Sequence, residues 1–373
     1  MKIIGIGIVA FLLFQLQRWI YRRLWDKNLK VSVFFAQKSI REGENGEIIE
    51  VIENRKRLPL PLLKVKFQTA KNLRFEKTVG SKTTDQYYRN DVFQIGSGEK
   101  ITRTLTFTGE KRGYYHIRNI DLIGLDLFLT DENLKSMTTD CYLYVYPKEF
   151  GSDNFRQSLQ KLNGEMLVKR HLLEDPFEYR GIREYQAFDD IRSVNWKATA
   201  KTGALKVNQK NYTAMETIRI FLNIEDSGVR KKDKEVETAI QIVMGLTTHF
   251  LSQGRKVSCY TNGRDILSGE TVMVAGGAGW GQRDAISKAL ARIDTSKTPF
   301  PFCRLWEEPI LEQSEHLLTL FVSPNSYPDF MELLTRCIEK GIDYTWFYPC
   351  EAFDKPKLPP LLARNVQLVH LPS

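Results

Sequence analysis

The sequence predicts a multi-domain protein in which an N-terminal transmembrane helix precedes an immunoglobulin-like β-sandwich and then an α/β domain. Three observations predict this fold class. Residues 3–14 form an unbroken apolar run, residues 30–146 alternate apolar and polar side chains with a period of two, and strand-like and helix-like segments alternate from residue 217 onward. The chain has 373 residues, of which 42% are hydrophobic and 27% charged, so it has room for two or three domains with hydrophobic cores.

Residues 1–24 are predicted to be a membrane anchor. The apolar run IIGIGIVAFLLF provides only about 18 Å of helix, so a helix that crosses a hydrocarbon core of about 30 Å has to continue to Tyr21. Arg18 can snorkel, and Trp19 and Tyr21 suit the membrane interface. The basic residues that follow place the body in the cytoplasm, which predicts a single-pass protein of the inner (cytoplasmic) membrane. A cleavable signal peptide and a buried core helix are the alternative interpretations.

Charge and cysteine content narrow the class of protein further. The net charge is +9, but several of the basic residues follow the apolar run directly, and elsewhere acidic and basic residues interleave, so we expect no nucleic-acid binding. The cysteines number five, are scattered and contain no CxxC pair, which argues against a disulfide framework and a zinc site and fits a reducing compartment.

Residues 30–150 are predicted to form the β-sandwich. Six segments read as short strands bounded by Gly, Asn, Pro or Asp, with no convincing helix between them. They are KVSVFFAQ, GEIIEVIENR, LLKVKFQTA, ITRTLTFTG, GYYHIRNIDLIG and CYLYVYP.

Residues 151–215 connect the two domains and contain the unusual segment 177–201, FEYRGIREYQAFDDIRSVNWKATAK. It mixes unlike charges with aromatic residues. One interpretation is structural: Asp189 or Asp190 pairs with Arg183 or Arg192, and Trp196 packs over a guanidinium at the base of the α/β domain. The alternative is that part of the segment stays exposed and docks a partner, because Arg, Tyr and Trp are favoured at interfaces.

Residues 216–373 are predicted to form an α/β domain with a largely parallel sheet. The first strand ends in LNIEDSG, where Asn223, Glu225, Asp226 and Ser227 either bind a hard cation such as Mg²⁺ or cap a loop. The glycine-rich segment 274–282 lacks a phosphate-binding motif, so we expect a flexible loop there and no nucleotide cofactor. The histidines lie in no recognisable nucleophile signature, and nothing marks an enzyme.

Segment 177–201 closely resembles the signature of the bacterial family called domain of unknown function 58. The residues at the pattern positions are Arg183, Tyr185, Asp189 or Asp190, Arg192, Trp196 and Ala200. Phe188 stands where glycine is usual and Lys201 where arginine is usual. Two further elements agree with the family, EKRGYYHIRNIDLIGLDLF at 110–128 and YVYP at 144–147, so the resemblance spans nearly the whole chain.

The resemblance implies that residues 216–373 are similar to a von Willebrand factor A domain of Rossmann type. The metal motif of such domains, Asp-x-Ser-x-Ser, aligns with Asn223, Glu225 and Ser227, so two of its three ligands differ here. The resemblance also implies a membrane-anchored adaptor, not itself an enzyme, that works with a MoxR-type AAA+ ATPase in protein assembly or maturation. The alternatives are an Mg²⁺-dependent membrane-associated enzyme and a binder of anionic lipid or nucleic acid.

Overall fold

The structure is a computed structural model that describes residues 2–371 with short gaps. The internal residues outside the description are 76–81, 84–85, 173, 187–188, 213–216, 227–231, 313–316, 352–355 and 357. The chain divides into two compact units. Unit 1 contains residues 1–148, 265–269 and 287–293, and unit 2 contains residues 149–264, 270–286 and 294–373.

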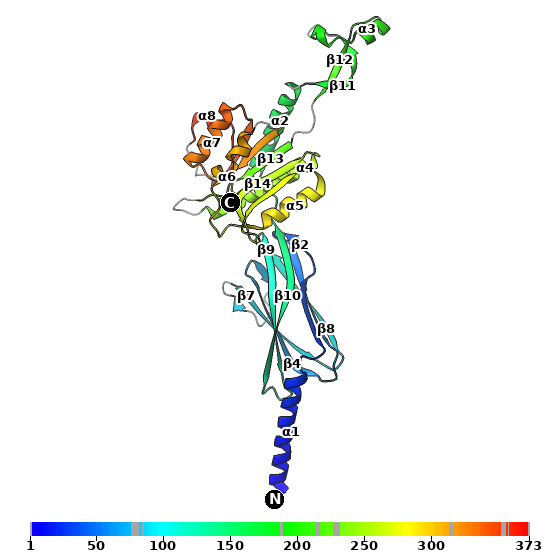
Figure 1. Ribbon diagram of the computed structural model, residues 1–373, viewed down its shortest axis with the longest axis vertical. Coiled ribbons are helices and arrows are strands. Elements are labelled where there is room, and N and C mark those ends of the chain that lie inside the picture. The colour runs from blue at the N-terminus through cyan, green and yellow to red at the C-terminus, as the bar shows by residue number, and fades with distance from the viewer. Residues whose placement is uncertain are drawn as a thin grey trace. The chain divides into compact units, whose positions relative to one another are not determined.

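Unit 1 begins with the predicted membrane helix, α1 (Lys2–Leu24), which enters one end of the strand region (Figure 1). Residues 3–24 are long and apolar enough to cross a membrane by length and composition. The apolar side chains of its first half are exposed, whereas Tyr21 and Trp25 are buried in the hydrophobic core that the strands form. The helix therefore continues directly into the folded body of the unit.

Ten strands of unit 1 form two sheets. The first has the order β1-β3-β8-β5, with bounds Leu29–Phe35, Asn45–Asn54, Lys100–Gly109 and Leu73–Phe75. The second has the order β2-β10-β9-β4-β7-β6, with bounds Ser39–Arg41, Glu132–Tyr146, Gly113–Leu125, Leu60–Ala70, Gln86–Ile95 and Lys82–Thr83. Buried side chains of both sheets belong to one hydrophobic cluster, which confirms the predicted β-sandwich.

The alternation of side chains explains why these segments form strands. Along β3 every second residue from Gly46 to Asn54 is buried, as expected for a strand with one face on the core. Close packing fixes the join between α1 and the sandwich as well. A Cβ atom at Gly124 would lie 2.3 Å from the Trp25 ring, so only glycine fits beneath this indole.

A charged cluster lies inside the sandwich. Glu50 of β3 is fully buried, and Arg89 and Asp91 of β7 are nearly so. Arg89 forms an ion pair with Asp91, and Arg103 of β8 reaches the same carboxylate across the two sheets at 2.9 Å. No donor reaches either carboxylate oxygen of Glu50 among the described residues. Burial, followed by the neighbouring Asp91 charge, raises the pKa of Glu50 to about 8, so this carboxyl is protonated at neutral pH and can donate to Asp91.

Unit 2 contains a mostly parallel sheet of order β15-β14-β13-β17-β18-β19. The bounds in that order are Thr271–Gly277, Val257–Asp265, Thr217–Leu222, Leu317–Val322, Tyr344–Cys350 and Val366–His370, and β16 (Ile293–Asp294) also pairs with β14. Only the β14–β15 pairing on this path is antiparallel. Numbered along the chain, the order is the doubly wound 3-2-1-4-5-6, whose switch point lies between β13 and β17. The predicted α/β fold is thus confirmed.

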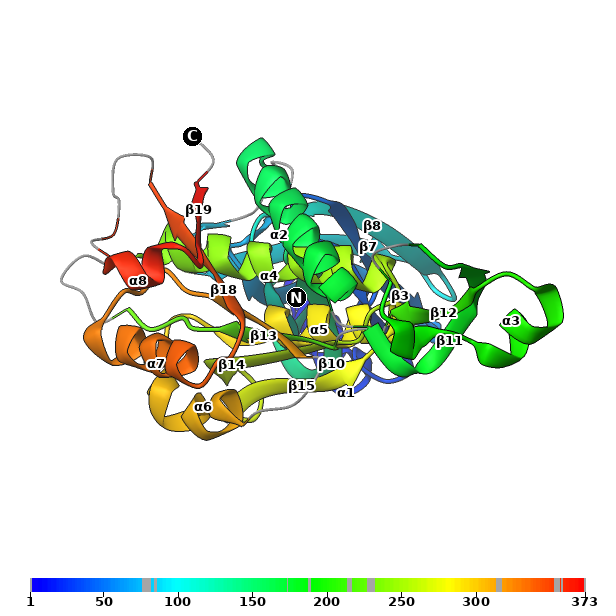
Figure 2. The same cartoon turned by 90° about the horizontal axis from the view of Figure 1, so that it is seen from above.

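Helices cover both faces of this sheet (Figure 2). On one face lie α2 (Asp153–Leu172) and α4 (Asp233–Ser252): Phe155 contacts Phe347 of β18, and Gly245 packs on Phe155. On the other face lie α6 (Phe302–Leu311), α7 (Pro328–Glu339) and α8 (Pro360–Ala363), where Phe330 contacts Trp346. Trp346 and Phe347 are neighbours in one strand, so their side chains point to opposite faces of the sheet. The sheet therefore has a hydrophobic layer on each face.

The glycine-rich segment 274–282 is not the flexible loop that the sequence suggested. Its first half is the end of β15, which pairs with β14, and its second half is the start of α5 (Gly279–Ala291). Gly279 has a positive φ of 77°, which suits the sharp change from strand to helix. The four glycines therefore lie where strand β15 ends and helix α5 begins.

Residues 174–212 form a small substructure of their own, here called the signature arm. Strands β11 (Glu174–Glu184) and β12 (Lys206–Tyr212) pair antiparallel as a two-stranded sheet. Between them lie a short 3₁₀ helix, η1 (Ile191–Ser193), and helix α3 (Trp196–Thr202). The segment that the sequence assigned to a connector is therefore a structured hairpin.

Candidate functional site

The signature arm is held together by an ion pair that the sequence predicted. The Arg183 guanidinium donates to both carboxylate oxygens of Asp189, each at 2.6 Å. Asp189 also accepts from the backbone N–H of Gln186 at 2.8 Å. The hydrogen bonds from Arg183 hold the pKa of Asp189 below its ordinary value. This bidentate contact closes the turn after β11.

The other polar signature residues cap local structure. Asp190 accepts from the backbone N–H of Arg192 at 3.0 Å and so caps η1. Asn195 caps α3 by accepting from Ala198 N–H at 2.9 Å, and its amide donates to Asn208 of β12 at 2.7 Å. Of the expected pairings, Asp189 with Arg183 is confirmed, while Asp190 acts as a helix cap.

Trp196 occupies a different environment from the one expected. Its side chain is 66% exposed, so the hypothesis that it fills the base of the α/β domain is wrong. Among the side chains of the arm that the structure describes, Val194 and Val207 are buried, and these two residues form an isolated bridge. A hairpin this small lacks the volume to enclose an indole as well.

Several apolar and cationic side chains of the arm face outward. The exposed large apolar residues are Ile182, Ile191, Trp196 and Leu205. Arg192, Lys197 and Lys201 are also exposed, and none forms an ion pair within the described part of the chain. Lys197 and Lys201 are four residues apart and lie on the same side of α3. Tyr185 is half-buried, and its backbone N–H donates to Leu205.

The carboxyl edge of β13 holds the residues predicted as a degenerate metal site. The carboxamide oxygen of Asn223 already accepts from Glu225 N–H at 3.0 Å and from Asn262 at 3.1 Å. Glu225 accepts from the backbone N–H of Phe302 at 3.1 Å, and burial raises the pKa of its carboxyl. Ser227 lies outside the described residues.

The described residues of this edge do not assemble a magnesium site. The free buried atom of Asn223 is its amide nitrogen, a donor that repels a cation. The Lys232 ammonium reaches Pro324 O at 3.0 Å and the Tyr348 hydroxyl at 3.4 Å, which adds positive charge near the ends of β17 and β18. Among the described residues no three acidic, His or Cys side chains gather as a metal-binding group. Asn262 of β14 instead holds this edge by hydrogen bonds to Asn223 and to Ile224 N–H.

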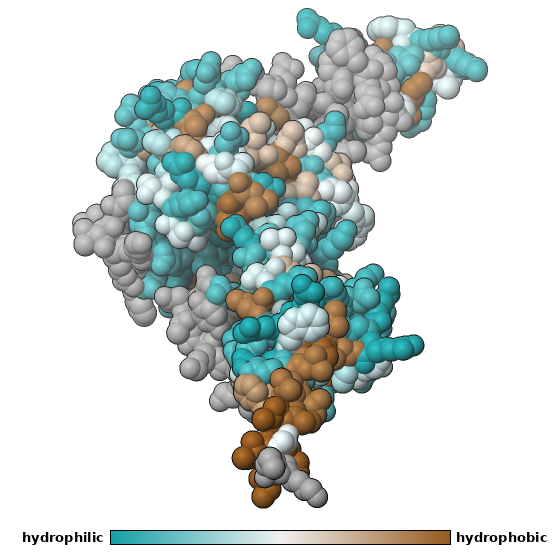
Figure 3. Space-filling model, turned by 60° about the horizontal axis from the view of Figure 1, so that its bottom comes forward, coloured by the Kyte–Doolittle hydropathy of each residue, from teal (hydrophilic) through white to brown (hydrophobic). Residues whose placement is uncertain are grey.

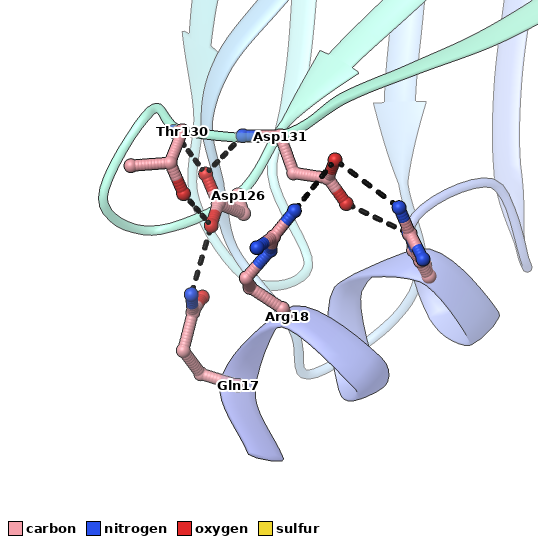
Figure 4. Close-up of polar contacts among 6 residues, drawn as sticks. Gln17, Arg18, Asp126, Thr130 and Asp131 are labelled. Carbon is pink, nitrogen blue, oxygen red and sulfur yellow. Dashed lines mark hydrogen bonds and ion pairs between the residues drawn. The ribbon is translucent and has the colours of Figure 1, made fainter. Parts of the chain in front are cut away.

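A second polar site joins α1 to the loop between β9 and β10 (Figure 4). Asp126 is fully buried and accepts four hydrogen bonds, from Gln17 Nε2 at 2.8 Å, Thr130 N at 2.6 Å, Thr130 Oγ1 at 2.9 Å and Asp131 N at 3.1 Å. Burial alone would raise its pKa, but the hydrogen bonds outweigh that effect and lower it. The bonds to the loop and to α1 converge on one carboxylate.

Two arginines of α1 complete this junction. Arg22 Nε lies 2.8 Å and Arg18 Nη2 3.2 Å from the Asp131 carboxylate. Tyr21 donates to Pro59 O at 3.0 Å, so the same helix turn is bonded to another loop. We call the contacts of Gln17, Arg18 and Arg22 with Asp126 and Asp131 the membrane junction. Sequence reasoning missed it, although polar residues inside an apolar helix are a signal for such a partner.

No family model and no curated protein matches the chain. Solved structures similar to part of it include the CARDB domain of a Pyrococcus furiosus protein, at 16% identity over 30% of this chain and 91% of that one, with a TM-score of 0.20. Domains D2 and D3 of the major pilin SpaD from Corynebacterium diphtheriae match at 12% identity over 33% and 57%, TM-score 0.24. A non-cellulosomal cohesin from Archaeoglobus fulgidus matches at 9% over 29% and 90%, TM-score 0.21.

Proposed function

We propose that this protein is a membrane-anchored, cytoplasm-facing adaptor that uses its signature arm to dock an AAA+ ATPase of MoxR type in protein assembly or maturation. The observation that carries the proposal is the exposed Trp196 beside Lys197 and Lys201 of α3, which form no ion pair with any described residue. Tryptophan is one of the residues on which binding energy concentrates at interfaces, and the lysines of α3 can pair with acidic groups of a partner.

The arm is built to present these side chains with little mobility. The Arg183–Asp189 pair and the Asn195 cap fix the segment that carries Trp196, so docking loses less conformational entropy than a disordered loop would. Lys197 and Lys201 call for acidic groups on the partner surface, because opposite charges steer association and set register.

Two further features support the adaptor. The doubly wound strand order of unit 2 suits a von Willebrand factor A-like domain, the docking module that the family resemblance implies. At the end of β13, Asn223 and Glu225 accept hydrogen bonds from within the fold, which favours a structural role for these two side chains over cation-dependent catalysis.

The test is affinity purification of the full-length chain from mild-detergent membranes, followed by mass spectrometry. A recovered AAA+ ATPase is then purified and its affinity measured against wild-type, Trp196→Ala and Trp280→Ala chains. Trp280 of α5 is the matched control because it is 81% exposed and lies outside the arm. A contact worth about 2 kcal/mol predicts a roughly thirtyfold weaker Kd for Trp196→Ala alone.

Two results would overturn the proposal. One is the absence of any AAA+ ATPase from the recovered proteins with nucleotide present. The other is an equal affinity of the two tryptophan variants for the ATPase. Because Trp196 is exposed, its replacement should leave the thermal unfolding of the chain unchanged, so lost binding is not explained by lost folding.

A further inference from the structure

We infer that the loop Leu127–Leu129 inserts into the lipid bilayer beside α1 and is a second membrane contact of this protein. The inference rests on α1 as a membrane helix and is independent of the ATPase partner. The loop joins β9 to β10 at the end of unit 1 where α1 enters.

The loop exposes three consecutive large apolar side chains. Leu127 and Leu129 are each 52% exposed and Phe128 is 58% exposed, although the sandwich core lies close by. Leu129 has a φ of 59°, in the left-handed region where glycine is the less strained residue. At Leu129 the backbone conformation favours glycine, yet the chain has a leucine whose apolar side chain is exposed.

The loop lies at the depth of the apolar part of α1. The Phe128 ring contacts the Phe14 ring, with 5.6 Å between centroids. Phe14 precedes Trp19, whose exposed ring suits the membrane interface, by five residues, which is about 7 Å along the helix axis. Tyr21 is buried in the sandwich core and does not mark this interface. Measured from Trp19, the loop reaches below the headgroups, to the depth that interfacial apolar segments commonly attain.

The apolar surface of α1 continues onto this end of unit 1. Figure 3 shows hydrophobic atoms that run from the N-terminal helix onto the adjacent part of the body. This surface is continuous with the lipid-facing part of α1, so lipid rather than a protein is expected to cover it. A protein partner here would have to displace lipid from α1 as well. Arg22 and Arg23 follow on the helix and suit an anionic headgroup layer.

The membrane junction fixes the loop at this depth. Asp126 accepts from Gln17 immediately before the apolar triplet, and Asp131 pairs with Arg18 and Arg22 immediately after it. Both ends of the loop are therefore bonded to α1. The Asp131 carboxylate is neutralised by Arg18 and Arg22, and the buried Asp126 carboxylate accepts four hydrogen bonds, which lowers the cost of placing the loop there.

The test places an environment-sensitive NBD fluorophore on a single introduced cysteine in the full-length chain. The chain is reconstituted into phosphatidylcholine–phosphatidylglycerol vesicles with or without doxyl-labelled lipid. Phe128→Cys is the reporter, Phe14→Cys is the reference inside the bilayer, and Phe34→Cys of β1 is the matched control, because Phe34 is 43% exposed on the sandwich surface. Four native thiols are buried, and burial raises the pKa of the half-buried Cys303 to about 12, so labelling at pH 7 favours the introduced site.

We expect doxyl lipid to quench the label at 128 nearly as well as that at 14, and at least about twofold more than that at 34. A label at 128 that behaves like the one at 34 would overturn the inference, as would a label at 14 that stays in water. If Phe128→Cys fails to fold, Leu127→Cys gives the same readout from the neighbouring residue. Loss of ATPase binding leaves all of these outcomes unchanged, so the two proposals fail separately.

Discussion

The buried carboxyl of Glu50 predicts that the β-sandwich loses stability as the pH rises. The perturbation is Glu50→Gln, which keeps the size of the side chain and offers amide N–H donors in place of the acid O–H, but cannot ionise. Glu50 is fully buried and lies on the core face of β3 between Ile48 and Ile52. Gln removes the titration and leaves the packing intact.

The direction in which the free energy of unfolding changes with pH follows from the raised pKa of Glu50. Below its ordinary value of 4.5 the carboxyl is protonated in both the folded and the unfolded chain, and its full contribution to stability is present. As the pH rises toward the folded value of about 8, the unfolded chain releases the proton while the folded one keeps it, so the free energy of unfolding falls. Each pKa unit is worth about 1.4 kcal/mol, so the wild type should lose about 3 kcal/mol between pH 6 and pH 9 relative to Glu50→Gln.

The assay has to report on unit 1 alone, because a chain of two units need not unfold in one step. Urea unfolding of the full-length chain in detergent, followed by pulsed hydrogen exchange and mass spectrometry, gives the stability of peptides from β3 and β8. Glu53→Gln is the control: Glu53 lies on the opposite face of the same strand with a 28% exposed side chain, and a hydrogen bond from Arg55 lowers its pKa.

The reasoning is refuted if the wild-type sandwich shows the same stability at pH 6 and pH 9. It is equally refuted if Glu50→Gln follows the wild-type slope, because the pH dependence would then come from another group. A Glu53→Gln chain that retains the full wild-type slope assigns the effect to the buried carboxyl.

Three further predictions concern the junction and the arm. Gly124→Ala places a Cβ atom 2.3 Å from the Trp25 ring and should cost about 1–3 kcal/mol of sandwich stability in the same urea assay, whereas an unchanged midpoint would contradict the packing argument. Asp126→Asn replaces a carboxylate that accepts four hydrogen bonds and should cost about 2 kcal/mol at pH 7. Because the folded pKa of Asp126 is lowered, that cost should begin to shrink as the pH falls below the ordinary value of 3.8 and vanish once the pH is below the lower folded pKa, and a cost that persists there would refute the assignment. Arg183→Lys removes the bidentate contact with Asp189, so amide exchange at Gln186 should accelerate severalfold, while equal exchange would show that the pair does not hold the turn.

Local patterns in the sequence were enough to predict most of the elements. The alternation along residues 46–54 and the apolar run of 217–222 became β3 and β13, because side-chain period and burial are properties of a strand that its own residues reveal. The glycine-rich segment 274–282 was misread because a pairing partner, β14, decides whether such residues extend as a strand.

In the candidate sites, too, contacts between residues near in sequence could be predicted, and contacts with distant residues could not. The charge pattern predicted that Asp189 or Asp190 pairs with Arg183 or Arg192, and the structure shows which pair forms, Arg183 with Asp189. The exposure of Trp196 could not be predicted, because burial depends on whether a distant surface covers the indole. The hydrogen bond from Asn262 to the Asn223 carboxamide oxygen could not be predicted either, because 39 residues separate these side chains along the chain.

The sequence by itself determined the class of the protein: an apolar N-terminal helix, a strand-rich region and an α/β region in that order, each written in local periodicity. Only the tertiary structure decided that Gln17, Arg18 and Arg22 meet Asp126 and Asp131 more than a hundred residues later. It also decided that Glu50 is enclosed with Asp91 between two sheets. The physical reason is that hydrogen bonding, desolvation and close packing act between side chains that are near in space, and a one-dimensional pattern carries no record of which distant residues those will be.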